Sequence, residues 1–187
     1  TNNRVVCIKQ SSATNGTIFE LCYNPDNKSV IERHIKDFTL SSSLVSTADV
    51  GAIIAEAAEA APANSYAMVF AGHGTGWIPR VLAESSVSTL ALGYDAWIPA
   101  EGAEVTRNFG ESNVKLDISE IAESIEYSGI ELDYILFDAC FMSNIEAVYD
   151  LRNSAKYIIA SPCEIMGKGF PYHRTLPHLF GESYNLR

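Results

Sequence analysis

The sequence lacks several patterns that would assign it to a common class of protein. Its four cysteines show no C-x-x-C spacing, which removes the usual zinc-site and thioredoxin-type interpretations. No apolar run approaches the roughly 20 residues that a membrane-spanning helix needs. The first residues lack the charged-then-apolar form of a signal peptide, and no internal repeat is present. No transmembrane segment is therefore expected.

Positive charge is also scarce. The 187 residues include 23 acidic and 13 basic ones, which gives a net charge of −10. The acidic residues are scattered along the chain, so nucleic acid is not an expected partner. With 47% hydrophobic residues, the chain is long enough for one substantial core. We expect a single domain over residues 1–187, and the sequence predicts no particular oligomeric state.

The N-terminal part predicts a β-hairpin with arms at Arg4–Gln10 and Thr17–Tyr23. Asn15-Gly16 is typical of the turn that such a hairpin needs. Cys7 and Cys22 lie on opposite arms, where they would form a disulfide or remain two buried thiols.

Beyond the hairpin, helical patterns alternate with short apolar runs. Ser46 and Asp117 each begin a capping-box pattern, and Gly129 is suited to end the second helix. This alternation predicts an α/β fold with a mostly parallel sheet. The expected elements are a helix from Ser46, a strand before His73, a helix over 117–128, a strand to Cys140, a helix over 143–152 and a strand over 156–161.

A histidine and a cysteine follow two of these apolar runs. His73 lies in Gly-His-Gly after one run, and Cys140 follows the other. The carboxyl ends of parallel strands meet at one edge of a sheet, where ligands bind. A thiol of pKa near ~8.5 needs a neighbouring base to act as a nucleophile, and His73 would supply it. The amides of Gly74 and Cys140 would then form an oxyanion hole, whereas the alternative is a buried structural cysteine and a loop histidine.

The surrounding residues resemble a known family. His73-Gly-Thr-Gly-Trp77 and the run from Phe137 to Arg152, followed by Tyr157-Ile-Ile-Ala-Ser161, closely resemble signature segments of the clostripain family of cysteine peptidases. That family shares a clan with caspases, gingipains and legumains. The resemblance extends over about residues 48–179 and implies a caspase-like three-layer α/β/α sandwich, with a mostly parallel central sheet plus the N-terminal hairpin.

The same resemblance implies a cysteine endopeptidase that hydrolyses peptide bonds through a thioester, with Cys140 as nucleophile and His73 as general acid/base. Asp138 matches an acidic residue beside the specificity pocket of relatives that cleave after Arg or Lys, or else it caps the following turn. Ser161 and Glu164 are the other candidate substrate-binding residues. The alternatives are a related peptidase or transpeptidase of different specificity, or a catalytically silent binding module.

Residues 78–113 show no sustained periodicity, so we expect a long loop there. Several clostripain-like enzymes are cut between their histidine and cysteine segments. By this resemblance, the loop would contain a self-cleavage site. Of its two basic residues, Arg80 lies close to the His73 turn, so the Arg107–Asn108 bond is the favoured position.

No cofactor is expected, and the histidines form no metal-ligand pattern. Some clostripain-like enzymes depend on calcium, and Asp95, Glu101 and Glu104 would be its ligands here. By resemblance the substrate is a peptide or protein, and the location is secreted, or at the surface or in the periplasm of a bacterium. Relatives usually begin with an apolar strand and helix and continue further, so we expect the catalytic domain to be incomplete at both ends.

Overall fold

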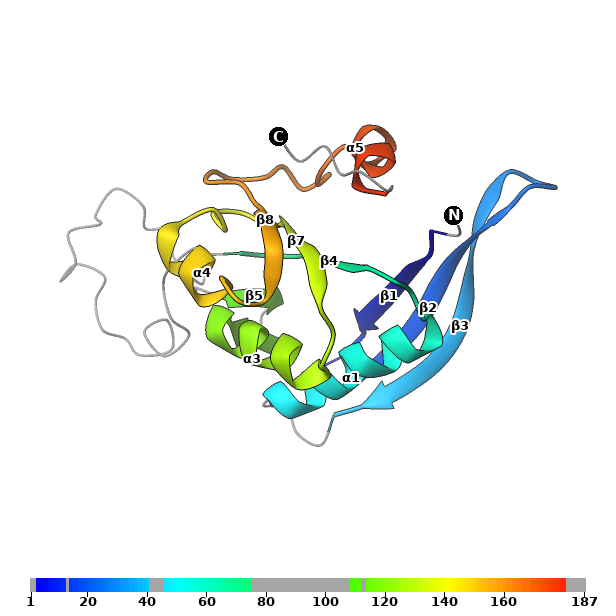
Figure 1. The fold of residues 1–187 in the computed structure, drawn as a ribbon. Coiled ribbons are helices and arrows are strands. Elements are labelled where there is room, and N and C mark those ends of the chain that lie inside the picture. Colours follow the sequence, from blue (N-terminus) through cyan, green and yellow to red (C-terminus); the bar gives the residue numbers. More distant parts are fainter. Residues whose placement is uncertain (1–2, 13, 41–45, 75–107, 112–113, 181–187) are drawn as a thin grey trace.

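The computed structural model describes residues 3–12, 14–40, 46–74, 108–111 and 114–180 (Figure 1). Side chains are described outside residues 108–111 and 114–115. The elements are β1 (Val5–Gln10), β2 (Asn15–Asn24), β3 (Ser29–Thr39), α1 (Thr47–Ala60), β4 (Tyr66–Ala71), β5 (Asn108–Glu111), β6 (Val114–Asp117), α3 (Ile118–Ser128), β7 (Leu132–Asp138), α4 (Ile145–Asp150), β8 (Ala155–Ile159) and α5 (Tyr172–Leu179).

The predicted hairpin is part of a three-stranded antiparallel sheet in the order β1-β2-β3. This sheet lies to one side of the other strands, beside α1 (Figure 1). Asn15 and Gly16 were predicted to form the turn, but they begin β2. The Ser12 hydroxyl instead accepts a hydrogen bond from the Asn15 amide at 3.0 Å, so a serine side chain supports the turn.

The cysteines of this sheet do not face each other. Cys7 pairs with Phe19 across β1 and β2, whereas Cys22 pairs with Ile31 across β2 and β3. Both are free thiols. The disulfide alternative is therefore wrong, because the register separates the two residues.

A second sheet contains the strands that precede the predicted reactive residues. Its order is β4-β7-β8, and both pairings are parallel. β7 is central and buried, with Ile135 and Phe137 fully covered. The Phe137 ring stacks on Phe70 of β4, with ring centroids 5.2 Å apart. A run buried on both faces explains why β7 reads as continuous apolar sequence.

Helices cover both faces of the parallel sheet. On one face Ile135 and Phe137 belong to a core with residues of α1 and α3, such as Ile54 and Ile121. On the other face Tyr134 and Leu136 form a smaller cluster with residues that include Leu179 of α5. The three-layer α/β/α arrangement predicted from the sequence is confirmed (Figure 1).

The helix ends follow the predicted capping residues. Ser46 accepts a hydrogen bond from the Asp49 amide at 3.1 Å, and Asp117 forms a capping box with Glu120. Gly129 ends α3 with a φ of 70°. The long loop was predicted to extend to Asn113, but in the structure β5 pairs with β6 in antiparallel register. Four-residue strands are too short to produce a clear alternation.

Candidate active site

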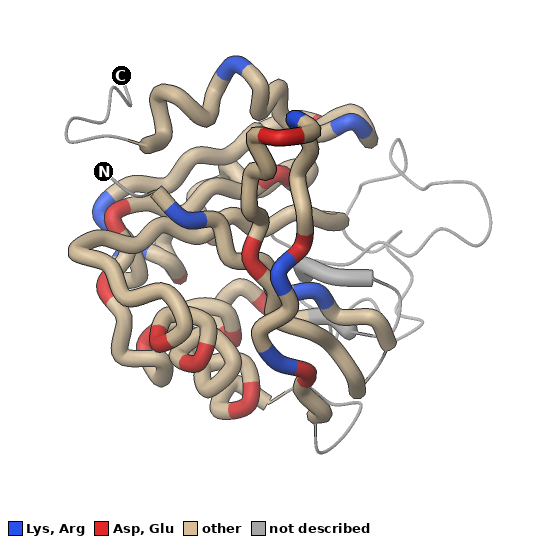
Figure 2. The backbone as a smooth tube through the Cα atoms, turned by 90° about the vertical axis from the view of Figure 1, so that its right-hand side faces the viewer, with Lys and Arg blue, Asp and Glu red and all other residues tan. Residues whose placement is uncertain are grey.

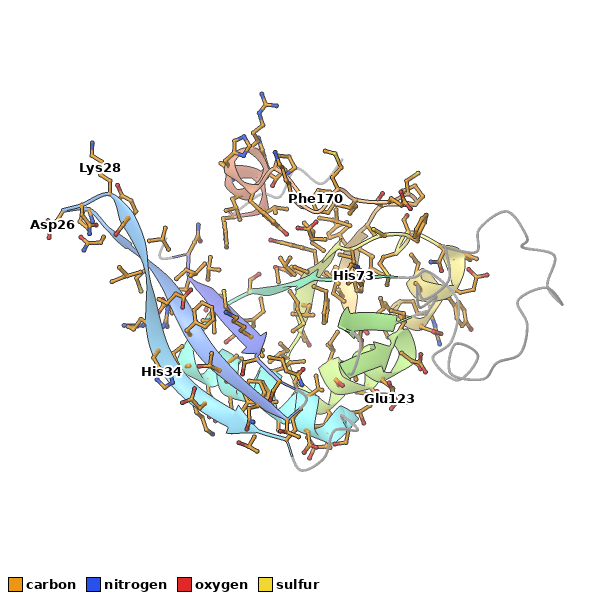
Figure 3. All side chains as sticks on the ribbon, turned by 180° about the vertical axis from the view of Figure 1, so that it is seen from behind. Asp26, Lys28, His34, His73, Glu123 and Phe170 are labelled. Carbon is orange, nitrogen blue, oxygen red and sulfur yellow. The ribbon has the colours of Figure 1, made fainter. Side chains whose placement is uncertain are left out.

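The register of the parallel sheet brings the predicted reactive residues to one edge. Ala71, the last residue of β4, pairs with Asp138, the last residue of β7. The Gly72 amide then donates to the Asp138 carbonyl oxygen at 3.3 Å. His73 and Cys140 therefore each lie two residues beyond a paired position. His73 is exposed at the end of β4 (Figure 3), and Cys140 is half-buried.

Gly74 packs directly against the turn that carries Cys140. It is buried, and a Cβ atom on it would lie 2.6 Å from the Cys140 carbonyl oxygen and 2.9 Å from the Met142 sulfur. A side chain at this position would push the two turns apart. The absence of a side chain thus lets the His73 turn approach the Cys140 turn.

Two features fix the conformation of the Cys140 turn: the backbone of Phe141 and the side chain that caps α4. Phe141 adopts a positive φ of 59°, which is uncommon for a residue with a large side chain. The Asn144 amide group donates to the Phe141 carbonyl at 2.7 Å, and its oxygen accepts from the Ala147 amide at 2.9 Å. One side chain therefore caps α4 and fixes the turn that precedes it.

Residues 160–171, here called the return segment, connect β8 to α5 and pass back along this turn. The Phe141 amide donates to the Cys163 carbonyl at 3.1 Å, and the Ser143 amide donates to the Ser161 carbonyl at 3.0 Å. Further along, the Ile165 amide donates to the Cys140 sulfur at 3.2 Å. The thiol in turn donates to the Ile165 carbonyl at 3.7 Å.

The Asp138 carboxylate binds the far end of the return segment. It accepts from the Phe170 amide at 3.1 Å and from the Tyr172 hydroxyl at 2.8 Å. Gly169 adopts a φ of 67°, and a Cβ atom there would overlap the Asp138 carboxylate. Burial, together with the Asp138 carboxylate, raises the pKa of the Tyr172 phenol.

Two of the other predicted site residues also lie on the return segment. Ser161 is half-buried, and its hydroxyl accepts from the Cys163 amide at 3.1 Å. Glu164 is exposed. Arg107 lies outside the described residues, and Asn108 begins β5.

Sequence reasoning missed Ile165 and Tyr172. Ile165 acts through its backbone, for which no sequence signal exists. Tyr172 was missed because no motif or spacing in the sequence distinguishes it from the neighbouring residues.

The calcium prediction falls outside the described residues, because Asp95, Glu101 and Glu104 do so. Among the residues that the structure describes, no group of three or more potential ligands could hold a metal ion. Within the same part of the chain, no helix is long and apolar enough to cross a membrane.

All the charged residues of α1 and α3 are acidic. Along the N-terminal sheet, by contrast, both signs alternate (Figure 2). This distribution favours the approach of cationic rather than anionic molecules.

Comparison with known proteins places this arrangement in a family. The sequence model of the Clostripain family matches residues 3–184. A secreted C11 cysteine protease from Bacteroides thetaiotaomicron, "iotapain", is 31% identical with a TM-score of 0.73, and the alignment covers 96% of this chain and 47% of that one. A search of curated proteins found no match.

Two further solved structures are similar. A secreted C11 cysteine protease from Bacteroides thetaiotaomicron, in complex with an irreversible peptide inhibitor, is 30% identical with a TM-score of 0.68, covering 97% of this chain and 44% of that one. An inactive zymogen C11 protease from Parabacteroides distasonis is 26% identical with a TM-score of 0.70, covering 98% of this chain and 44% of that one.

The chain thus spans about half the length of the solved proteins it matches. The family model covers nearly the whole chain. The layers of the chain and the turns at its strand ends agree with the predicted caspase-like fold. The chain belongs to the clostripain family of cysteine peptidases.

Proposed function

We propose that this chain contains the catalytic centre of a cysteine endopeptidase. One observation supports this most directly: β4 and β7 are parallel neighbours in a register that sets His73 and Cys140 at equivalent positions beyond their ends. Gly74 then closes the distance between the two turns. Thiol catalysis requires a base close to the nucleophile, and neighbouring strand ends are a place where the two residues can meet.

In the proposed reaction, His73 takes the proton of the Cys140 thiol, and the resulting thiolate attacks the peptide carbonyl to form a tetrahedral intermediate. His73 donates a proton to the leaving amine, which leaves a thioester on Cys140. Water, deprotonated by His73, then attacks the thioester, and the carboxylate product leaves as the thiol is restored. These steps use only groups of the protein and water.

The negative oxygen of the tetrahedral intermediate needs hydrogen-bond donors. We assign this role to the backbone amides of Gly74 and Cys140. Such a donor contributes on the order of 3 kcal/mol to transition-state stabilisation. The packing of Gly74 against the Cys140 carbonyl supports the proposal, because it brings the two amides onto adjoining turns.

For substrate preference, we propose cleavage after Arg or Lys. Asp138 lies at the end of β7, Ser161 lies on the part of the return segment that contacts the Cys140 turn, Glu164 follows it on that segment, and the net charge is −10. Lys168, exposed on the same segment, opposes this preference. A peptidase or transpeptidase of another specificity is therefore the alternative.

Two further properties are proposed from the relatives. Those from Bacteroides thetaiotaomicron are described as secreted, and we propose the same for this protein. The relative from Parabacteroides distasonis is described as an inactive zymogen. This supports the proposal that this protein also has an inactive precursor. We propose that self-cleavage at the Arg107–Asn108 bond activates it.

Active-site labelling tests the proposed function. Peptide acyloxymethyl ketones with Lys or Leu at the reacting position are incubated with the wild type, Cys140→Ala and Cys163→Ala. We expect Cys140→Ala to lose labelling and to lower peptide hydrolysis by at least about a thousandfold, because removal of a nucleophile costs several orders of magnitude. Cys163→Ala removes the exposed thiol on the return segment, and this variant is expected to be labelled like the wild type.

The outcomes separate the alternatives. Labelling by the lysine probe alone supports the basic preference, whereas labelling by the leucine probe alone supports another specificity. Transfer of the acyl group to an added amine in place of water would indicate a transpeptidase. A folded wild type that neither reacts nor hydrolyses peptides would instead be a silent binding module.

A further inference from the structure

Asp138 links three parts of the structure that are far apart in the sequence. It ends β7, its backbone carbonyl accepts from Gly72 after β4, and its carboxylate accepts from Phe170 and Tyr172. These contacts join the histidine strand, the cysteine strand and the return segment at one residue. A side chain that only capped the following turn would not reach Phe170 and Tyr172.

The return segment is attached at both ends, with Cys140 between them. At its near end, Phe141 and Ser143 donate backbone hydrogen bonds to it. At its far end, Tyr172 begins α5, and α5 is fixed on the sheet because Tyr134 donates to the Leu179 carbonyl at 3.2 Å. Ile165 lies between the two attachments and contacts the thiol through its backbone.

The far attachment is closely fitted around the carboxylate. Asp138 is half-buried, and it receives one backbone donor and one phenol donor. The positive φ of Gly169 turns the chain so that the Phe170 amide points at the carboxylate, and only a residue without a side chain leaves room for it. Phe170 also packs against the Tyr134 and Leu136 cluster.

We propose that Asp138 and Tyr172 form a latch that holds the return segment against Cys140, so that Tyr172 is a positioning residue for the nucleophile. The latch determines the position of the Ile165 backbone, which hydrogen-bonds to the Cys140 sulfur. It therefore restricts the orientation of the thiol. The inference rests on the proposed function, because a thiol orientation matters only if Cys140 reacts. It differs from a pocket role of Asp138, which would affect only basic substrates.

Tyr172→Phe tests the latch, because it removes one hydroxyl and keeps the ring. The matched control is Tyr157→Phe, which makes the same change at an exposed position on β8. We expect faster hydrogen exchange in residues 163–171 of Tyr172→Phe alone. We also expect kcat/KM to fall by about tenfold or more, since a small displacement of a reacting group has large kinetic effects. This loss should be equal for substrates with Lys and with Leu before the cleaved bond.

Gly169→Ala is a second variant with the same expected direction, because its methyl group would displace the carboxylate. Unchanged exchange in both variants would refute the latch, whatever the activity. Faster exchange with unchanged kcat/KM, or with a loss confined to the lysine substrate, would refute the positioning role. A wild type that cleaves neither substrate would refute the proposed function, while the exchange measurement would still decide whether the latch exists.

Discussion

At the scale of single residues, Glu20 has an environment unlike that of the other carboxylates described. Glu20 lies on β2 and its side chain is 8% exposed. The carboxylate accepts hydrogen bonds from Arg4 at 2.7 and 2.9 Å and from Arg33. The Arg4 hydrogen bond, helped by Arg33, lowers the pKa of Glu20 to about 2 against the opposing effect of burial. The charged form is therefore the one that the fold stabilises.

This shift predicts acid sensitivity. The pKa of Glu20 is lower in the folded chain than its unfolded value of roughly 4.3, so its stabilising effect is complete above that pH and disappears as the pH falls toward about 2. Glu20→Gln should lower the free energy of unfolding at neutral pH and flatten its pH dependence in this window. Urea denaturation at a series of pH values measures both effects.

Glu123→Gln, at an exposed position on α3, is the control for that measurement. It should retain the wild-type slope between those two pH values. A Glu20→Gln variant with an unchanged slope would show that Arg4 and Arg33 do not stabilise the charged carboxylate.

The candidate catalytic residues could be predicted from the sequence, but the residues that hold them in place could not. His73 and Cys140 follow apolar runs, and strand ends are where reactive groups gather, so their nearness could be predicted. The partners of Asp138 lie 32 and 34 residues further along the chain, and one of them is a backbone amide. Sequence patterns show periodicity and local caps, whereas contacts of this kind depend on the path of the return segment.

At the scale of elements, α4 and the Cys140 turn depend on one cap. Asn144 accepts from Ala147 and donates to Phe141, so its loss should free both the helix end and the turn. Asn144→Ala is expected to destabilise the fold by about 1 kcal/mol and also to lower kcat. Thermal denaturation and peptide hydrolysis measure the two effects.

Ser46→Ala is the matched variant, because Ser46 caps α1 away from the Cys140 turn. It should lose similar stability and keep the wild-type kcat. Equal activity losses in both variants would mean that Asn144 affects catalysis only through general stability.

Buried helices and strands were predicted from the sequence more accurately than exposed ones. β7 is covered on both faces and α3 has a cap at each end, so both were predicted close to their observed bounds. β3 was missed because most of its residues are exposed, which removes the alternation that identifies a half-buried strand.

At the scale of the whole molecule, self-cleavage can be examined without a substrate. If Cys140 cuts the Arg107–Asn108 bond, intact-mass spectrometry should find a fragment ending at Arg107 in the wild type and only uncut chain in Cys140→Ala. Addition of wild-type protein to Cys140→Ala would show whether one molecule cuts another. Full activity of an uncut wild-type chain would refute activation by this cut.

The pairing of β4 with β7 determines what such a cut would leave behind. One fragment would contain His73 and the other Cys140, yet the two would remain joined by the parallel hydrogen bonds of the sheet and by the packing of α1 on α3. The product would be a two-chain protein with one shared catalytic centre. Neither fragment could act by itself. The cleaved protein would therefore stay active only as long as non-covalent contacts hold its two fragments together.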